Sequence, residues 1–179
     1  MTDASQLFHE LADREAIREC LYRYSRAIDR REEALLRTVY WPDGYDNHGF
    51  FEGDVDTFIA WAFAALEPIQ QSMHSLTNIL INIDLPHAQT ETYFVAYHRI
   101  AAPSGELVDM TLGGRFLDSM EKRGDEWRIA RRDTAIDWLS EAPDSGDWAA
   151  WLPGVPRKTH VAPDDLSCGL FAGTRFDTR

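Results

Sequence analysis

The sequence predicts an α+β fold in which N-terminal helices cover one face of a strongly bent antiparallel sheet. Apolar residues recur at helical spacing up to about residue 66, and from Gln71 onward the pattern changes to long strand-like runs separated by turn signals. Helices followed by an antiparallel meander are typical of this class. With 179 residues, 44% of them hydrophobic, the chain can form one domain whose core encloses a ligand cavity.

The first helix is expected to begin with Asp13 as its N-cap and to bury one apolar stripe. That stripe consists of Ile17, Cys20, Leu21, Tyr24, Ala27 and Ile28. Asp29 follows at the edge of the stripe, near the C-terminal end of the helix, where a carboxylate meets the unfavourable end of the helix dipole. An acid in this position needs a partner from elsewhere in the chain.

Two further helices and a short strand are expected before the sheet. A helix from Glu32 to about Tyr40 ends at the turn 41–44, and a brief aromatic strand covers 45–51. A third amphipathic helix then runs from residue 54 to Pro68.

Four long strands form the predicted meander, at 72–84, 89–102, 106–123 and 125–139, joined by turns at 85–87, 103–105 and 123–125. Gly113 and Gly114 inside the third strand predict a bulge or sharp bend. We expect residues 1–140 to form the domain. Residues 141–179 are rich in Pro, Gly, Asp and Ser, and we expect them to pack on the pocket mouth or on a neighbouring subunit, with Trp148 and Trp151 as contacts.

Charge and cysteine content exclude several classes of protein. The chain has 30 acidic and 18 basic residues, a net charge of −12, which argues against nucleic acid and anionic membranes as partners. Cys20 and Cys168 form neither a disulfide framework nor a metal-ligand spacing, and the polar N-terminus and the lack of a long apolar run predict a cytoplasmic protein.

Short motifs for metals and cofactors are missing from the sequence. There is no H-x-x-x-H, H-x-H or C-x-x-C pattern, no glycine-rich phosphate-binding motif and no G-x-S-x-G. His9, His48, His87 and His160 fall in predicted terminal, strand-end or loop positions. We therefore expect neither a metal nor any other cofactor.

Four segments carry a resemblance to a known family: "LADREAIRECLYRYSRAIDRRE", "SMHSLTNILINID", "YFVAYHR" and "DEWRIARRDTAIDW". Over roughly residues 5–140 the chain resembles the SnoaL-like branch of the nuclear-transport-factor-2-like superfamily, which includes scytalone dehydratase, bile-acid dehydratases and hexachlorocyclohexane dehydrochlorinase. The resemblance implies a cone-shaped fold. The same fold also hosts transport factors and the non-catalytic small subunits of ring-hydroxylating dioxygenases.

The resemblance also implies catalytic residues. Asp29 and His74 match a carboxylate–imidazole pair in which the histidine acts as general base and the aspartate orients it. Tyr24 and Arg132 match positions that some of these enzymes use, whereas His98 stands where the bile-acid dehydratases carry an acid. The alternative is that Asp29 caps a turn and that His74 is a hydrogen-bonded core histidine.

Each further residue has two interpretations. The Tyr24 phenol can donate to a substrate oxygen or be a satisfied core group, and His98, which shares strand parity with Phe94, can be an acid–base group or a satisfied inward histidine. Arg131 and Arg132 point to opposite faces of a regular strand, and a bulge would reconcile their parity with that of their neighbours. We select Arg132 as the pocket cation; otherwise it forms a buried structural ion pair with Asp29, Asp109 or Asp133.

Aromatic residues are expected to line the pocket or to form an ordinary core. The candidates are Trp41, Phe58, Trp61, Phe63, Phe94 and Phe116. We select Trp41, Trp61 and Phe94, together with His98, as substrate-binding residues.

These inferences predict a cofactor-independent lyase that acts on a hydrophobic aromatic or polycyclic small molecule in aromatic compound catabolism. A dehydratase, a dehydrohalogenase and an aldehyde-releasing carbon–carbon lyase all fit, and an isomerase or cyclase would use the same groups. A non-catalytic subunit would show the pair apart and the interior filled, and a ligand carrier would not need His74. Because open sheet faces in this fold are usually covered, we expect a homo-oligomer, either a trimer or a dimer.

Overall fold

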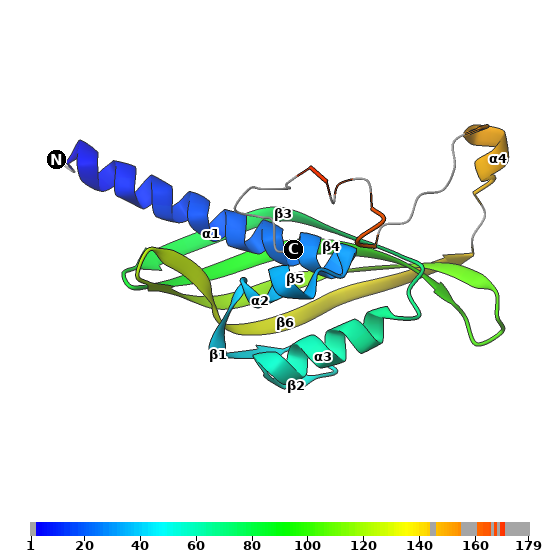
Figure 1. Cartoon of the computed structure of the whole chain (residues 1–179), viewed down its shortest axis with the longest axis horizontal. Helices are drawn as coiled ribbons and strands as arrows, with labels where there is room; N and C mark the ends of the chain where they lie inside the picture. The colour runs from blue at the N-terminus through cyan, green and yellow to red at the C-terminus, as the bar shows by residue number, and fades with distance from the viewer. Residues whose placement is uncertain (1–2, 144–145, 155–160, 166, 168, 171–179) are drawn as a thin grey trace.

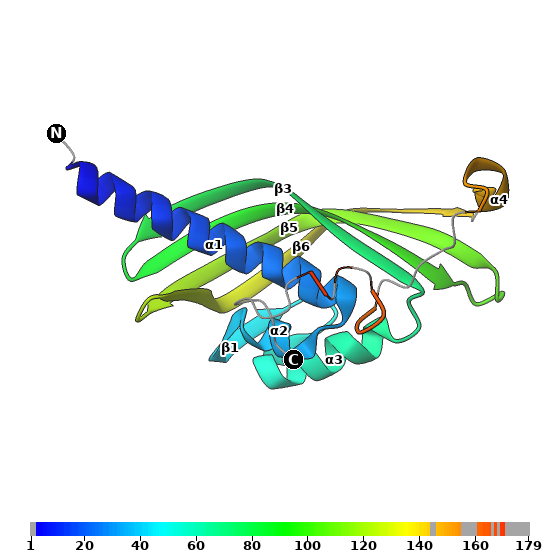
Figure 2. The same ribbon diagram turned by 45° about the horizontal axis from the view of Figure 1, so that its top comes forward.

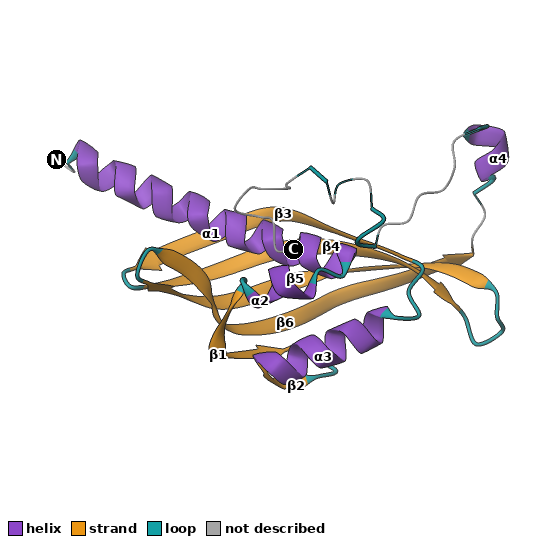
Figure 3. Cartoon of the chain, in the orientation of Figure 1, coloured by secondary structure: helices purple, strands orange, loops and turns teal. Residues whose placement is uncertain are grey.

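Three helices lie on one face of a curved six-stranded sheet (Figure 1). The computed structural model describes residues 3–143, 146–154, 161–165, 167 and 169–170. Its elements, coloured by type in Figure 3, are α1 (Ala4–Arg30), α2 (Glu33–Arg37), β1 (Tyr40–Asn47), β2 (Glu52–Asp54), α3 (Val55–Leu66), β3 (Gln71–Asp84), β4 (His87–Ala101), β5 (Leu107–Arg123), β6 (Glu126–Pro143) and α4 (Trp148–Trp151). The predicted α+β class is confirmed.

The sheet has the strand order β2-β1-β6-β5-β4-β3, and it is mixed. Strands β3 to β6 form the predicted antiparallel meander, with turns at all three predicted positions. Strand β1, however, pairs with β6 in parallel. The predicted turn at 41–44 lies inside β1, because the chain there continues across a register shift between Tyr40 and Tyr45 and does not reverse direction.

Helix α1 crosses the concave face of the sheet and is longer than predicted (Figure 2). Its N-cap is Asp3, whose side chain accepts a hydrogen bond from the Ser5 backbone, and not Asp13. Asp13 is buried within the helix because Lys122 and Trp127 on the sheet both donate to its Oδ1, at 2.6 and 2.8 Å. The predicted apolar stripe from residue 17 to residue 28 is buried throughout.

The C-terminal turn of α1 is fixed in place by Arg31. This residue adopts a left-handed conformation, with φ of 56°, which ends the helix. Its guanidinium donates to the carbonyl oxygens of Leu66 and Ile69, both at 2.6 Å, at the end of α3. The turn that carries Asp29 is thereby tied to α3.

Two bulges bend the β5–β6 ladder. Ala130 is the extra residue of the first, between the pairs Ser119–Arg131 and Met120–Ile129, and this insertion lets Ile129 and Arg132 both face inward. The bulge expected from strand parity is therefore confirmed. The second shift lies at the predicted Gly113–Gly114 position, where a Cβ on Gly114 would come within 2.1 Å of the Ala135 carbonyl oxygen.

The segment after the sheet contacts α1 where it is described. Strand β6 runs through the predicted boundary at residue 140 and ends at Pro143. The Ala162 amide donates to the Arg30 carbonyl at 2.8 Å, and Arg26 donates to Ser167 Oγ at 2.9 Å. Cys168, His160 and the Trp148 side chain lie outside the described residues, while Trp151 is 82% exposed, so the contact with another subunit remains a prediction. Among the described helices, none has the length and apolar character needed to cross a bilayer.

Candidate active site

A cavity of about 290 Å³ lies between α1, α3 and the concave face of the sheet. Its lining is mostly aliphatic and aromatic, and the polar groups are Tyr24, His48, His74 and His98. Within the described ranges, no Asp, Glu, Lys or Arg side chain lines it. The apolar part consists of Ile28, Phe50, Phe58, Trp61, Ala62, Ala65, Leu66, Ile69, Phe94, Met110, Leu112, Phe116, Ile136 and Leu139. A few polar groups on an apolar wall are typical of small-molecule sites.

Asp29 and His74 meet at the wall of this cavity. His74 Nδ1 lies 2.7 Å from Asp29 Oδ1, and the two side chains are only 9% and 8% exposed. Strand β3 supplies two more donors to the same carboxylate: Ser72 Oγ donates to Oδ1 and the His74 amide donates to Oδ2, both at 2.8 Å. The inward carboxylate on α1 therefore has three donors, all from β3, where residues 72 and 74 share one face of the strand.

These donors determine the charge of Asp29. Burial raises the pKa of its carboxyl, but the hydrogen bonds from His74 and Ser72 and the attraction of the imidazole outweigh burial, so the pKa lies below its ordinary value. The anionic carboxylate fixes Nδ1 of His74 as a donor. The other ring nitrogen, Nε2, is then the one left for a ligand, because His74 lines the cavity.

His98 stands beside His74 on the neighbouring strand, with 5.5 Å between the ring centroids. Neither of its buried ring nitrogens has a hydrogen-bond partner among the residues that the structure describes, so the interpretation as a satisfied histidine is wrong. Burial, together with the nearby His74, lowers its pKa to about 4. The ring is therefore neutral near pH 7 and offers the cavity one donor and one acceptor, groups that are costly to leave unpaired.

Tyr24 reaches the cavity from α1, and its ring packs edge-on against Phe116 at 5.3 Å. Burial raises the pKa of its phenol above the ordinary value. The hydroxyl group therefore stays protonated and can donate to an oxygen in the cavity.

Arg132 does not line the cavity, and its predicted role as pocket cation is corrected. Its side chain is fully buried, and Nε and Nη2 donate to the two carboxylate oxygens of Asp118 at 2.6 and 2.8 Å. The guanidinium carbon lies 4.1 Å from the centre of the Tyr24 ring and 4.0 Å from that of Phe116, behind the wall that these rings form. Arg131 points outward and pairs with Asp133.

The family follows from a direct comparison. The family model described as a SnoaL-like domain matches residues 9–133. The chain belongs to the SnoaL-like family. A relative in Mycobacterium bovis, named only as an uncharacterized protein, is 26% identical to this SnoaL-like chain over 126 residues, which are 69% of the chain and 84% of the relative.

Solved structures share the fold of this SnoaL-like domain. A hexachlorocyclohexane dehydrochlorinase from Novosphingobium barchaimii superposes with a TM-score of 0.68 at 14% identity, covering 83% of this chain and 97% of that one. A candidate scytalone dehydratase of Novosphingobium aromaticivorans gives a TM-score of 0.66 at 19% identity, over 74% and 89% of the two chains. At these identities the likeness concerns the fold.

The aromatic residues expected at the site of this SnoaL-like domain divide into two groups. Trp61, Phe94, Phe58 and Phe116 line the cavity. Trp41 does not: its indole donates to the Glu121 carbonyl at 3.0 Å, and two arginine side chains stack on the ring. The choice of Trp41 is thus wrong, because the path of β1 places this residue away from the cavity. Phe63, another candidate, is not among the lining residues.

Sequence reasoning missed the third imidazole in the cavity. His48, just beyond β1, lines the cavity, and its Nδ1 lies 3.1 Å from Asp46 Oδ1. The signal was present as D-x-H, because residues two apart in an extended chain share one face. In the part of the chain that the structure describes, His, Cys, Asp and Glu side chains nowhere gather in threes as metal ligands would.

Proposed function

We propose that the protein is a cofactor-independent lyase that takes a proton from carbon in a small, neutral, hydrophobic molecule and expels a neighbouring group. The observation that carries this proposal is the Asp29–His74 pair on the wall of an apolar cavity. His74 Nε2 takes the proton, and the Asp29 carboxylate on Nδ1 stabilises the imidazolium that forms. General-base catalysis of this kind contributes roughly 10²- to 10⁴-fold.

Two neutral donors are available for the oxygen of the substrate. The Tyr24 phenol stays protonated because burial raises its pKa, and His98 stays neutral because burial lowers its pKa to about 4. Each can donate a hydrogen bond to a carbonyl or departing oxygen as negative charge develops there. Because both donors are uncharged, both suit an uncharged substrate.

The cavity also narrows the substrate class. Its volume of about 290 Å³ is at the small end for ligand sites, which begin near roughly 300 Å³. This size favours one or two rings over a tetracyclic compound. No Lys or Arg side chain is present among the described lining residues to bind an anion. We propose a neutral monocyclic or bicyclic aromatic substrate, with loss of water, halide or an aldehyde fragment as the reaction.

An isomerase is the second candidate, and the closeness of His74 and His98 supports it. The two ring centroids are 5.5 Å apart, so one ligand can contact both imidazoles. A proton taken at one carbon could then be returned at another with no group leaving. The non-catalytic alternative is less favoured, because it expects the pair to be apart and the interior to be filled.

The proposal is tested with 5-nitro-1,2-benzisoxazole, a neutral bicyclic probe. A base takes its ring C–H proton, the N–O bond breaks, and a coloured cyanophenolate is released without any cofactor. We expect wild type to exceed His74→Ala by about 10²-fold or more in kcat/KM, with Asp29→Asn also reduced. His87→Ala, a change at an exposed histidine on the sheet rim, is the control and should match wild type.

One outcome contradicts the proposal: equal rates for wild type and His74→Ala, which a ligand carrier would give. If His74→Ala is slower than wild type, a parallel screen of hydroxylated and halogenated one- and two-ring compounds with the same variants would identify the natural leaving group.

A further inference from the structure

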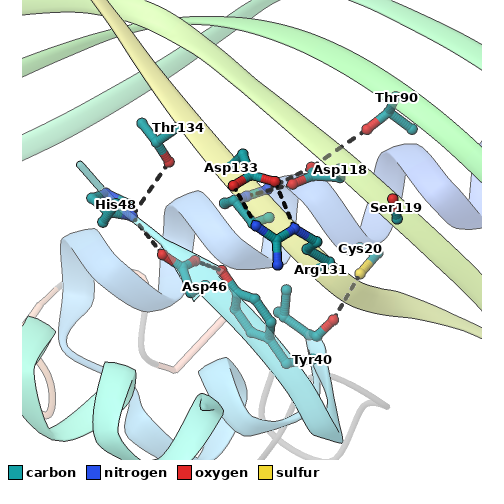
Figure 4. Close-up of polar contacts among 12 residues, drawn as sticks. Cys20, Tyr40, Asp46, His48, Thr90, Asp118, Ser119, Arg131, Asp133 and Thr134 are labelled. Atoms are coloured by element: carbon teal, nitrogen blue, oxygen red, sulfur yellow. Dashed lines mark hydrogen bonds and ion pairs between the residues drawn. The ribbon is translucent and has the colours of Figure 1, made fainter. Parts of the chain in front are cut away.

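A second carboxylate–imidazole pair faces the cavity from the side opposite His74. Figure 4 shows Asp46 between Tyr40 and His48, with Thr134 next to the same ring nitrogen of His48. Asp46 is fully buried, and Tyr40 donates to its Oδ2 at 2.6 Å. His48 Nδ1 lies 3.1 Å from Asp46 Oδ1 and 3.4 Å from Thr134 Oγ1. Nδ1 is thus occupied, and Nε2 is the ring nitrogen left for a ligand.

The two imidazoles lie next to different members of one stacked aromatic pair. Phe94 and Phe116 stack with their centroids 4.2 Å apart and their planes at 14°. The His74 ring lies 6.4 Å from Phe94, and the His48 ring lies 6.2 Å from Phe116. His74 comes from β3, an edge strand, whereas His48 follows β1 near the other edge of the curved sheet. Both imidazoles line the same cavity of about 290 Å³, so one ligand in it can contact both.

The carboxylates of the two pairs differ in how their charge is balanced. Asp29 has three donors, whereas the buried Asp46 has only the Tyr40 hydroxyl and the His48 ring in the described contacts. Arg132 on β6, which is paired with Asp46 in the β1–β6 ladder, donates to Asp118 on β5. A buried carboxylate is costly unless donors pair with it, and Tyr40 and His48 are the donors that reach Asp46 in the described contacts.

We infer that His48 is the proton donor to the departing oxygen, acting opposite His74; this inference rests on the proposed function. As His74 Nε2 takes the proton, the electron pair of the C–H bond becomes the new π bond. The carbon–oxygen bond breaks, and the oxygen takes its electron pair and a proton from His48 Nε2. With a hydroxyl as leaving group the products are an alkene and water, and one proton passing from His74 to solvent and one from solvent to His48 restores the enzyme.

This arrangement selects a leaving group. A halide departs without a proton, so a positioned acid adds little, whereas hydroxide needs one. The second pair therefore points to loss of water from a hydroxylated ring compound whose acidic C–H and hydroxyl face opposite walls. The Thr134 hydroxyl is a positioning group for the imidazole.

The test compares two probes that differ in leaving group. Unsubstituted 1,2-benzisoxazole releases a more basic phenolate than its 5-nitro derivative and depends more on an acid. We expect His48→Gln to lower kcat/KM for the unsubstituted probe by about tenfold more than for the nitro probe, whereas His74→Ala lowers both to a similar extent. His48→Phe, which keeps the ring packed between Phe58 and Trp61, should reproduce this selective loss, and His87→Gln is the control.

The outcomes separate the two proposals. If His48→Gln and His48→Phe lower both probes equally, or lower neither, the donor role is overturned while the base stands. If His74→Ala leaves both rates at the wild-type value, the proposed function itself fails, whatever the His48 variants do.

Discussion

The unpartnered His98 should make the stability of the protein depend on pH in a defined way. Burial lowers its pKa in the folded state to about 4, against 6.5 for an ordinary histidine. Between these values the unfolded chain binds a proton that the folded chain does not, so stability is complete above pH 6.5 and is lost as the pH falls toward 4. At about pH 4.5 this linkage amounts to roughly 2 kcal/mol relative to neutral pH.

His98→Leu removes the linkage. Urea unfolding of wild type and variant, followed by tryptophan fluorescence at neutral pH and at about pH 4.5, should show that wild type loses roughly 2 kcal/mol more than the variant on acidification. The groups that face His98, namely His74 and Asp29, are present in both proteins. His87→Leu, at an exposed histidine, should follow wild type. Parallel pH dependence of wild type and His98→Leu would refute the reasoning.

Two further changes test the sheet and the buried ion pair. Gly114→Ala places a Cβ within 2.1 Å of the Ala135 carbonyl oxygen and should destabilise the fold by about 1–3 kcal/mol in urea unfolding, whereas Gly146→Ala, with open space around it, should be close to neutral. A cost below about 0.5 kcal/mol for Gly114→Ala would contradict the close approach at this bulge. Arg132→Met leaves Asp118 buried without its cation and should cost about 3–5 kcal/mol, and the added change Asp118→Leu should recover most of this loss. Failure of the double variant to recover would show that Arg132 has a role beyond its pairing with Asp118.

Local patterns predicted most of the fold. Period-two alternation located β3 to β6 within a few residues, and helical spacing identified the buried stripe of α1, because both signals are contained in contiguous sequence. The parallel pairing of β1 with β6 joins segments more than eighty residues apart, as the pair Asp46–Arg132 shows, and no local pattern encodes it. That strand also determines which side chains of 40–48 face the cavity, which is why Trp41 was chosen in error and His48 was missed.

The site was predictable to a similar depth. The inward direction of Asp29 follows from helical periodicity and that of Arg132 from strand parity and one bulge, whereas His74 was assigned through the resemblance. The partner of Arg132 does not, because it depends on the register that sets Asp118 directly opposite on β5. The lack of hydrogen-bond partners for His98 in the described structure likewise cannot be read from local sequence, because it depends on which groups the folded chain places around the ring.

Arg31 at the end of α1 has a consequence for engineering. Glycine at a left-handed helix terminus is a standard stabilising replacement, since the absence of a Cβ relieves the backbone. At this terminus the replacement would also delete the two hydrogen bonds to the Leu66 and Ile69 carbonyl oxygens, which hold the last turn of α1. In a more heat-tolerant Arg31→Gly variant, the Asp29 carboxylate would therefore be held less firmly in its position beside His74. Selection for thermal tolerance and selection for turnover are expected to favour different residues at position 31.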